Sequence, residues 1–165
     1  MEARQLPAEF KEFIQLLNSE KVKYLIIGGW AVNLYGNPRV TADIDFFVSM
    51  ESKNVDRILA AYKKFGMNNV PREHFNIKGN VVRLGFPPTR IELITGISGV
   101  EFSDCYKNRK EINIDGMKAK FISKKDLIKN KIASGRHKDL ADVDALRLPK
   151  KRNIKRAIKK KKSNG

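Results

Sequence analysis

Hydrophobic residues in the first part of the chain recur at helical spacing in some segments and at strand spacing in others. Intervals of three and four predict an amphipathic helix over Pro7–Ser19. The short apolar run Tyr24–Ile27 ends at a glycine pair and predicts a buried strand, and Asp43–Val48 predicts a second strand. Helical spacing returns in residues 30–36 and 53–64. The predicted order is therefore helix, strand, helix, strand, helix.

Beyond Gly66 the apolar runs become shorter and are separated by glycine and proline. The predicted strands of this part are 75–77, 81–86, 90–95, 111–114 and 118–122. The first three should pair as antiparallel neighbours, and Asp115-Gly116 between the last two is typical of a hairpin turn. Two helices should follow, one starting at Ser123 and one over 138–146. This mixture of strands and helices predicts an α+β fold.

The chain fits a single domain, because its 165 residues fall in the usual range of domain sizes. We expect this domain to cover residues 1–149 and to be followed by a basic tail over 150–165. With 41% hydrophobic and 32% charged residues, the composition excludes a disordered chain. No apolar run approaches the roughly 18 residues of a membrane-spanning helix, and Met1–Pro7 has no signal-peptide core. We therefore expect a cytoplasmic protein without a membrane partner.

The formal net charge of +16 is concentrated near the C-terminus. Nine lysines and arginines, and no acid, lie between Lys150 and Lys162. Such a block is either a solvated tail or an arm that contacts a polyanion, for which RNA is the candidate. The single cysteine, Cys105, excludes an internal disulfide, and two histidines add too few soft ligands for a zinc site. Any metal ion must therefore be held by carboxylates.

A glycine pair and an Asp-x-Asp sequence carry the first candidate chemistry. Gly28-Gly29 lies at a predicted strand-to-helix junction, where it forms either a simple tight turn or a turn whose backbone N–H groups approach a phosphate. Residues i and i+2 of a strand point to the same face, so Asp43 and Asp45 should place two carboxylates roughly 6.5–7 Å apart. Ile44 should point into the core. Two such carboxylates repel each other, and binding a hard cation relieves the repulsion.

Glu92 is a third acid, isolated between Ile91 and Leu93 in a later predicted strand. An acid in an apolar strand requires a partner or a cation to offset its burial. The glycine pair, the two aspartates and this glutamate therefore form one candidate site.

These motifs, YLIIGG, DID and RIELIT, occur in the order found in the minimal nucleotidyltransferases of the DNA polymerase beta-like superfamily, which the sequence resembles. The stretch GGWAVNLYGNPRVTADIDFFV is similar to the subgroup with GGWAV and with Arg-x-Thr before the aspartates. The resemblance extends over residues 20–146 and continues in LGFPPTRIELITGISGVEF and FISKKDLIKNKIASGRHKDLADVDAL. It implies the polymerase beta-like nucleotidyltransferase fold, a mixed central sheet covered by helices, with C-terminal helices.

The resemblance also implies an activity: transfer of a nucleoside monophosphate from an NTP such as ATP to an acceptor hydroxyl, with pyrophosphate as the leaving group. It implies a two-metal Mg²⁺ site in which Asp43, Asp45 and Glu92 are catalytic residues and metal ligands. Glu92 either ligates the catalytic ion or acts as general base. The sequence departs from the family pattern by having glutamate where aspartate is more common, and Gly29-Trp30 where many relatives have serine.

In addition to the glycine pair, four residues are candidates for nucleotide or phosphate binding. The fork of Arg39 suits a carboxylate or a phosphate. Thr41 either bonds a phosphate or an aspartate, or only favours the strand conformation. The resemblance makes Lys131 and Arg136 candidates for binding the triphosphate, and the alternative is an ordinary charged helix face.

The sequence leaves the acceptor and the partners open. The acceptor hydroxyl belongs to a small molecule such as an antibiotic, to a protein or to an RNA end, and the basic tail 150–162 favours RNA. Relatives act in antibiotic modification and in toxin–antitoxin systems, and no residue selects one role. A helical partner protein or a second protomer is expected to complete the site. The alternative function is a non-catalytic nucleotide- or RNA-binding module, against which the presence of all three acids argues.

Overall fold

The computed structural model describes residues 6–36 and 40–148, so Arg39 and the basic tail lie outside the described residues. A single six-stranded sheet forms the centre, in the order β3-β4-β2-β1-β6-β5. Its strands are β1 (Tyr24–Ile27), β2 (Asp43–Val48), β3 (Val81–Leu84), β4 (Arg90–Ile94), β5 (Lys110–Ile114) and β6 (Met117–Phe121). β2 pairs with β4 and β1 with β6 in parallel, whereas the other neighbours are antiparallel. The sheet is therefore mixed, as the sequence predicted.

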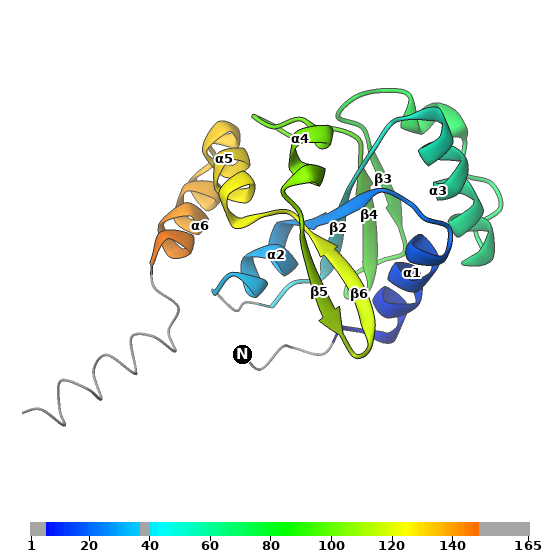
Figure 1. Cartoon of the computed structure of the whole chain (residues 1–165), viewed down its shortest axis with the longest axis horizontal. Coiled ribbons are helices and arrows are strands. Elements are labelled where there is room, and N and C mark those ends of the chain that lie inside the picture. Colours follow the sequence, from blue (N-terminus) through cyan, green and yellow to red (C-terminus); the bar gives the residue numbers. More distant parts are fainter. Residues whose placement is uncertain (1–5, 37–39, 149–165) are drawn as a thin grey trace, which may run out of the picture.

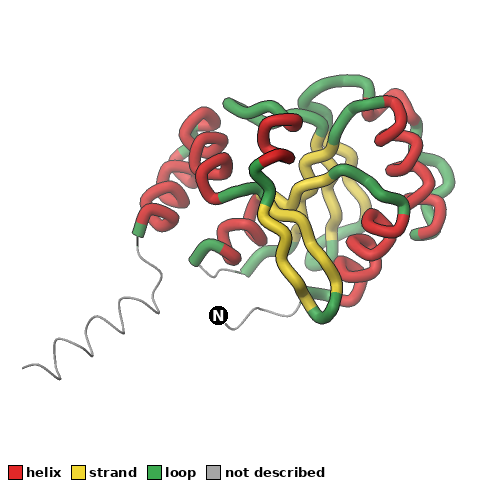
Figure 2. Tube along the Cα trace, viewed as in Figure 1, coloured by secondary structure: helices red, strands yellow, loops and turns green. Residues whose placement is uncertain are grey.

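Helices cover both faces of the sheet (Figures 1 and 2). They are α1 (Ala8–Ser19), α2 (Gly28–Leu34), α3 (Ser52–Lys64), the 3₁₀ helix η1 (Arg72–Phe75), α4 (Phe102–Lys107), α5 (Lys124–Ser134) and α6 (His137–Arg147). Figure 1 shows α1 and α3 on one side of the sheet, and α2, α4, α5 and α6 on the other. The expected α+β fold is thus confirmed.

Neighbouring side chains of β2 show which face each helix covers. Phe46 contacts Phe13 of α1, with ring centroids 5.6 Å apart, and Phe13 in turn contacts Tyr62 of α3. Phe47 points the other way and packs edge-on against Phe102 of α4. Because side chains alternate along a strand, Asp43 and Asp45 share the face of Phe47. Ile44 shares the opposite face and is fully buried, as predicted.

The face under α1 and α3 holds much of the aromatic core. Phe10, Phe13, Tyr24, Phe46 and Tyr62 are all fully buried there. Burying one large apolar side chain contributes roughly 1.5–3 kcal/mol relative to leaving it exposed. The stability supplied by this layer allows the opposite face to carry polar groups.

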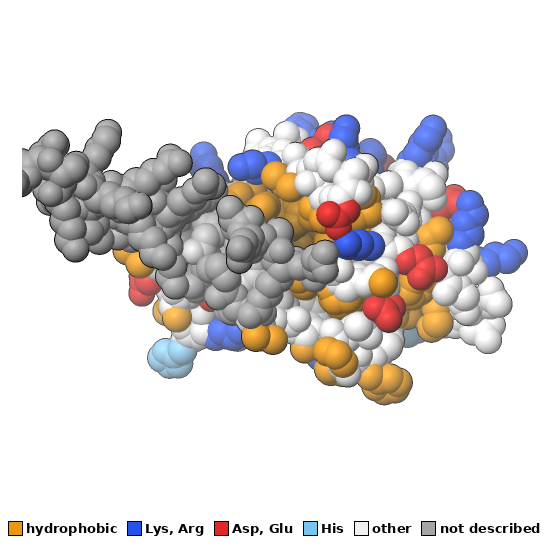
Figure 3. Space-filling view, turned by 90° about the horizontal axis from the view of Figure 1, so that it is seen from below, with side chains coloured by type: hydrophobic (Ala, Val, Ile, Leu, Met, Phe, Trp, Pro, Cys, Tyr) orange, Lys and Arg blue, Asp and Glu red, His pale blue; other side chains and the backbone are white. Residues whose placement is uncertain are grey.

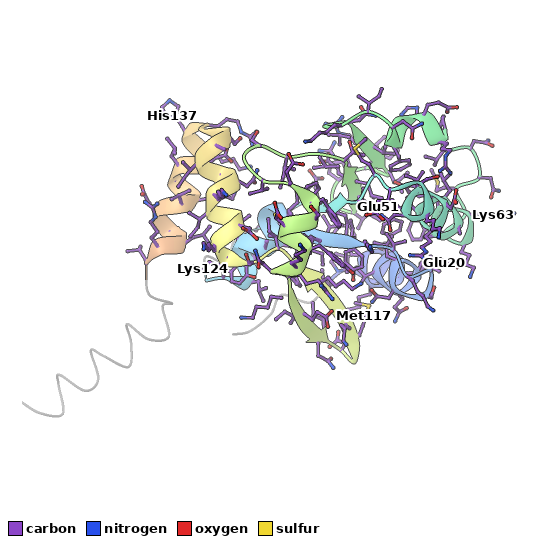
Figure 4. All side chains as sticks on the ribbon, turned by 45° about the horizontal axis from the view of Figure 1, so that its top comes forward. Glu20, Glu51, Lys63, Met117, Lys124 and His137 are labelled. Carbon is purple, nitrogen blue, oxygen red and sulfur yellow. The ribbon has the colours of Figure 1, made fainter. Side chains whose placement is uncertain are left out.

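The C-terminal helices form a hairpin beside the sheet, and Figure 4 shows Lys124 and His137 at opposite ends of it, where α5 and α6 begin. The side chain of Ser123 caps α5 by accepting a hydrogen bond of 3.1 Å from the backbone N–H of Asp126, as the sequence predicted. An acid in the first turn also favours the positive end of the helix dipole. The hairpin brings the end of α5 and the start of α6 toward the strand ends.

Two sequence predictions of secondary structure differ from the structure. The segment 75–77 was expected to be a strand, but Phe75 ends η1 and the residues after it form a turn. Its three residues show no clear periodicity, so strand and helix could not be distinguished. The helix α4 has six residues and was not predicted, because so short a helix shows less than two full turns of apolar spacing.

On the face shown in Figure 3, acidic and basic side chains are intermixed with exposed hydrophobic ones. Among residues 6–36 and 40–148, Phe86 and Val40 are the most exposed large hydrophobic residues, at 83% and 81%. Within residues 6–36 and 40–148, none of the helices combines the length and the apolar character that crossing a bilayer requires.

Candidate active site

The three candidate acids lie side by side on two neighbouring strands. β2 and β4 run parallel, with Asp45 opposite Glu92 and Asp43 opposite Arg90. Residues in register across a sheet point to the same face, so all four side chains stand on the face that carries α2 and α4. The pairing therefore brings together the two acids of the DID motif and the distant Glu92, as the sequence predicted.

Two arginines form hydrogen bonds with the carboxylates of Asp43 and Glu92. Arg90 donates two hydrogen bonds to the carboxylate of Asp43, with Nε 3.1 Å from Oδ1 and Nη2 2.9 Å from Oδ2. Glu92 accepts a hydrogen bond of 2.9 Å from Nε of Arg83, and Nε of Arg90 lies 3.4 Å from the same Oε1 atom. Neither arginine was predicted from the sequence to belong to the site. The two-residue spacing of Arg90 and Glu92 is a signal that could have revealed Arg90, because it puts both on one strand face.

Asp45 has a different environment from the other two acids. Burial, the hydrogen bond with Glu92 and the charges of Glu92 and Asp43 raise its pKa to about 7, against the lowering effect of Arg90. Its Oδ1 atom is buried and has no hydrogen-bond partner among the described residues. A buried carboxylate oxygen without a partner is costly, and a hard cation would relieve that cost.

This donor set fits a divalent cation in its chemistry, since all three side chains offer hard oxygen ligands. Among residues 6–36 and 40–148, however, no three His, Cys, Asp or Glu side chains are grouped tightly enough to hold one ion as they stand. The role of the acids as metal ligands stays a prediction.

The glycine pair packs directly against the start of β2. Gly28 has φ +66° and begins α2, and a Cβ atom there would collide with Oδ2 of Asp45. A Cβ on Gly29 would lie about 3.0 Å from the side chain of Thr41. The pair therefore lets the β1–α2 turn approach the acids closely. Phosphate binding by this turn stays a prediction.

A cleft of about 240 Å³ opens beside Asp45. It is lined by the β1–α2 turn, by residues that follow β4, and by the facing ends of α5 and α6. Gly28, Asp45, Lys131 and Arg136 all line it. Four of the residues predicted from the sequence thus border one cavity, although Lys131 and Arg136 are far from the others in the sequence.

Lys131 of α5 is buried and forms ion pairs with two aspartates of α6. Its Nζ atom lies 2.8 Å from Oδ2 of Asp142 and 3.6 Å from Oδ1 of Asp139. This ion pair joins α5 to α6. Triphosphate binding by Lys131 stays a prediction.

Arg136 lies at the start of α6 with its side chain 74% exposed. Its Nε atom donates a hydrogen bond of 2.7 Å to Oδ2 of Asp139. Burial acts to raise the pKa of Asp139, but hydrogen bonds with Arg136 and Ser134 and the charges of Arg136 and Lys131 outweigh it and lower the pKa to about 2.

Thr41 directs its hydroxyl to the backbone, because Oγ1 donates a hydrogen bond of 3.0 Å to the carbonyl of Asp43. Phosphate binding by Thr41 stays a prediction. Arg39 is outside the described residues. Trp30, the third residue of α2, packs edge-on against Phe10.

Two solved structures have a similar fold. An antigenic nucleotidyltransferase-like protein from Paracoccidioides brasiliensis is 19% identical with a TM-score of 0.51, over 84% of this chain and 74% of that one. The lincosamide antibiotic adenylyltransferase LnuA, solved with lincomycin bound, is 17% identical with a TM-score of 0.50, over 86% of this chain and 96% of that one. At such identities the likeness establishes the fold.

The family follows from the sequence itself. The model described as "Nucleotidyltransferase of unknown function (DUF6036)" matches residues 4–159. The chain belongs to this family, and the protein is a nucleotidyltransferase. No curated protein matches it in sequence. The narrower resemblance to the minimal nucleotidyltransferases stays a prediction.

Proposed function

We propose that this enzyme transfers a nucleoside monophosphate from an NTP to the hydroxyl group of an acceptor, with Mg²⁺ as cofactor and pyrophosphate as the leaving group. One observation carries the proposal: Asp43, Asp45 and Glu92 stand together on one sheet face, beside the glycine turn and the cleft. Asp45 supports it most strongly, because its buried oxygen lacks a partner and its pKa is raised to about 7. A bound cation would stabilise the ionised form of this carboxyl.

Asp43, Asp45 and Glu92 are the residues that would hold the divalent ions. When bound, Mg²⁺ would neutralise charge on the phosphates and lower the pKa of the acceptor hydroxyl. Glu92 is either the third ligand or the general base that takes the hydroxyl proton. Its side chain is 13% exposed, so it is accessible from the site while it is held by Arg83.

The cleft beside Asp45 is where we place the triphosphate. The exposed guanidinium of Arg136 is suited to bind phosphate oxygens there, while its hydrogen bond to Asp139 keeps it in position. The glycine turn contributes a backbone surface without side chains on the other side of the cleft. In this proposal Lys131 keeps α5 and α6 together and supports the wall that carries Arg136.

ATP is the first donor to test, because one structural neighbour is an adenylyltransferase. The acceptor belongs to one of the three predicted classes: small molecules, proteins or RNA ends. The family assignment favours catalysis over the non-catalytic binding module.

The proposal is tested by incubating the purified protein with each α-³²P-labelled NTP and Mg²⁺ in cell extract, and separating RNA, protein and small molecules. We expect label from one nucleotide in one fraction, which identifies the acceptor class. Asp45→Asn should reduce this labelling at least about 100-fold, as removal of a group that stabilises transition-state charge does.

Asp144→Asn is the matched control, because Asp144 is an exposed carboxylate on α6. The amount of label transferred by Asp144→Asn should equal that of the unmodified protein. Undiminished labelling by a folded Asp45→Asn protein would remove Asp45 from the catalytic site.

A further inference from the structure

Arg90 contacts two of the three acids and has no role in the proposed function so far. Its guanidinium occupies both oxygens of Asp43, at 3.1 and 2.9 Å. It also lies 3.4 Å from Oε1 of Glu92, two residues further along β4. One side chain therefore bridges two of the three acids that the proposed function assigns to the divalent ions.

We propose that Arg90 is the resident counter-ion of the acid site, and that it must leave Asp43 for a divalent cation to bind there. This inference rests on the proposed function. A guanidinium fork on a carboxylate uses the lone pairs on the inner side of both oxygens. A cation at the same carboxylate would lie a few ångströms from the guanidinium, and two like charges at that distance repel strongly in a partly buried site. Arg90 and the cation are therefore competitors.

The side chain of Arg90 has room to move, because it is 32% exposed at the rim of the sheet. Once released from Asp43, its guanidinium would remain close to the site, to which the proposed function brings the phosphates of the nucleotide. A phosphate is the other anion that suits the arginine fork. Arg90 would then be a positioning residue that couples the two binding events: the cation displaces it, and the nucleotide gives it a new partner.

Arg83 provides a natural comparison. It also binds Glu92, at 2.9 Å, but it lies on the edge strand β3 and its side chain is 60% exposed. It lies opposite Glu92 of β4, whereas Asp43 lies one strand further away, on β2. Removing Arg83 deletes one positive charge near the site but leaves the two hydrogen bonds from Arg90 to Asp43 in place. The Arg83 variant therefore shows how much of any change in metal affinity comes from the lost charge alone, without release of Asp43.

The test is the binding of Mn²⁺ without nucleotide, measured from the electron paramagnetic resonance of free Mn²⁺, with the full chain and its Arg90→Gln and Arg83→Gln variants. We expect Arg90→Gln to bind Mn²⁺ roughly two- to fivefold more tightly, the range expected for release of a partly exposed ion pair. Arg83→Gln should change the affinity less than about twofold. Mn²⁺ should also raise the melting temperature of Arg90→Gln more than that of the unmodified protein.

Each other outcome overturns the inference. Equal or weaker Mn²⁺ binding by Arg90→Gln contradicts the competition and leaves the proposed function standing, and so does an equal gain in both variants. Absence of Mn²⁺ binding by all three proteins removes the metal site on which both proposals rest. If Arg90→Gln does not fold, Arg90→Lys replaces it, since an ammonium cannot hold both oxygens of Asp43: tighter binding of Mn²⁺ supports the inference and unchanged binding refutes it.

Discussion

The backbone of Gly28 lies directly against the carboxylate of Asp45, so that a Cβ atom at position 28 would overlap Oδ2. The glycine also has φ +66°, in the left-handed region that other residues seldom adopt. Only glycine at position 28 therefore lets the turn after β1 lie this close to Asp45 without displacing its carboxylate.

Gly28→Ala should move Asp45 and abolish most of the transfer activity, with a loss of at least about 100-fold. Gly116→Ala is the matched control, because Gly116 has φ +80° but a Cβ atom there meets nothing within 4 Å. Both variants should lose about 1 kcal/mol of unfolding free energy from the backbone conformation alone. Urea unfolding and the labelling assay measure the two effects. Equal activity of the two variants would show that the contact with Asp45 is unimportant.

Lys131→Met should destabilise the protein by about 1.5–3 kcal/mol, because it removes the contacts of the ammonium with the buried carboxylates of Asp139 and Asp142. Lys125→Met, an exposed lysine on the same helix, should change the free energy of unfolding by less than about 0.5 kcal/mol. Urea denaturation distinguishes the two. If Lys131→Met keeps its stability but no longer binds nucleotide, Lys131 binds the triphosphate directly instead of joining the helices.

The C-terminal helix pair should be sensitive to acid through Asp139. Its folded-state pKa is lowered to about 2, whereas an unfolded aspartate titrates near about 4. The stability that its ionised form contributes is therefore complete above about pH 4 and is lost as the pH falls toward about 2, on the order of 2 kcal/mol in total. Asp139→Asn lacks this contribution.

Urea unfolding of both proteins at several pH values measures the difference. The free-energy gap between the unmodified protein and Asp139→Asn should be largest near neutral pH and should narrow as the pH falls below about 4. A gap that does not change with pH would mean that Arg136 and Lys131 do not stabilise the charge of Asp139.

The basic tail is proposed to contact RNA, and deleting residues 150–165 tests this partner. The deletion should weaken RNA binding and reduce its dependence on salt, because fewer phosphate charges are then neutralised. Filter binding over a range of salt concentrations measures both. Identical affinities at every salt concentration would exclude the tail from RNA binding.

Sequence patterns predicted the parts of the fold that depend on local spacing. The alternation in Asp43–Val48 was sufficient to place the two aspartates on one face, since the other face packs against α1 and α3. The helix α4 escaped prediction because six residues carry too little periodicity. Glu92 was identified as a partner of the aspartates, and the parallel pairing of β2 with β4 supplied the geometry.

The pairing partners of the charged residues were harder to predict. Lys131 meets Asp142 across two helices, and only the hairpin shows that its ammonium is buried between two acids. Arg90 lies on the same strand face as Glu92, but its contact with Asp43 depends on the register between β4 and β2. Such contacts arise from tertiary structure, on which short-range spacing carries no information.

The central claim is that a nucleoside monophosphate, and not a terminal phosphate, is transferred. Parallel reactions with α-³²P- and γ-³²P-labelled NTP, with and without Mg²⁺, test it most directly. We predict that the α label enters the acceptor only when Mg²⁺ is present, and that the γ label is recovered in pyrophosphate. Entry of the γ label into the acceptor would instead identify a phosphotransferase and contradict the account.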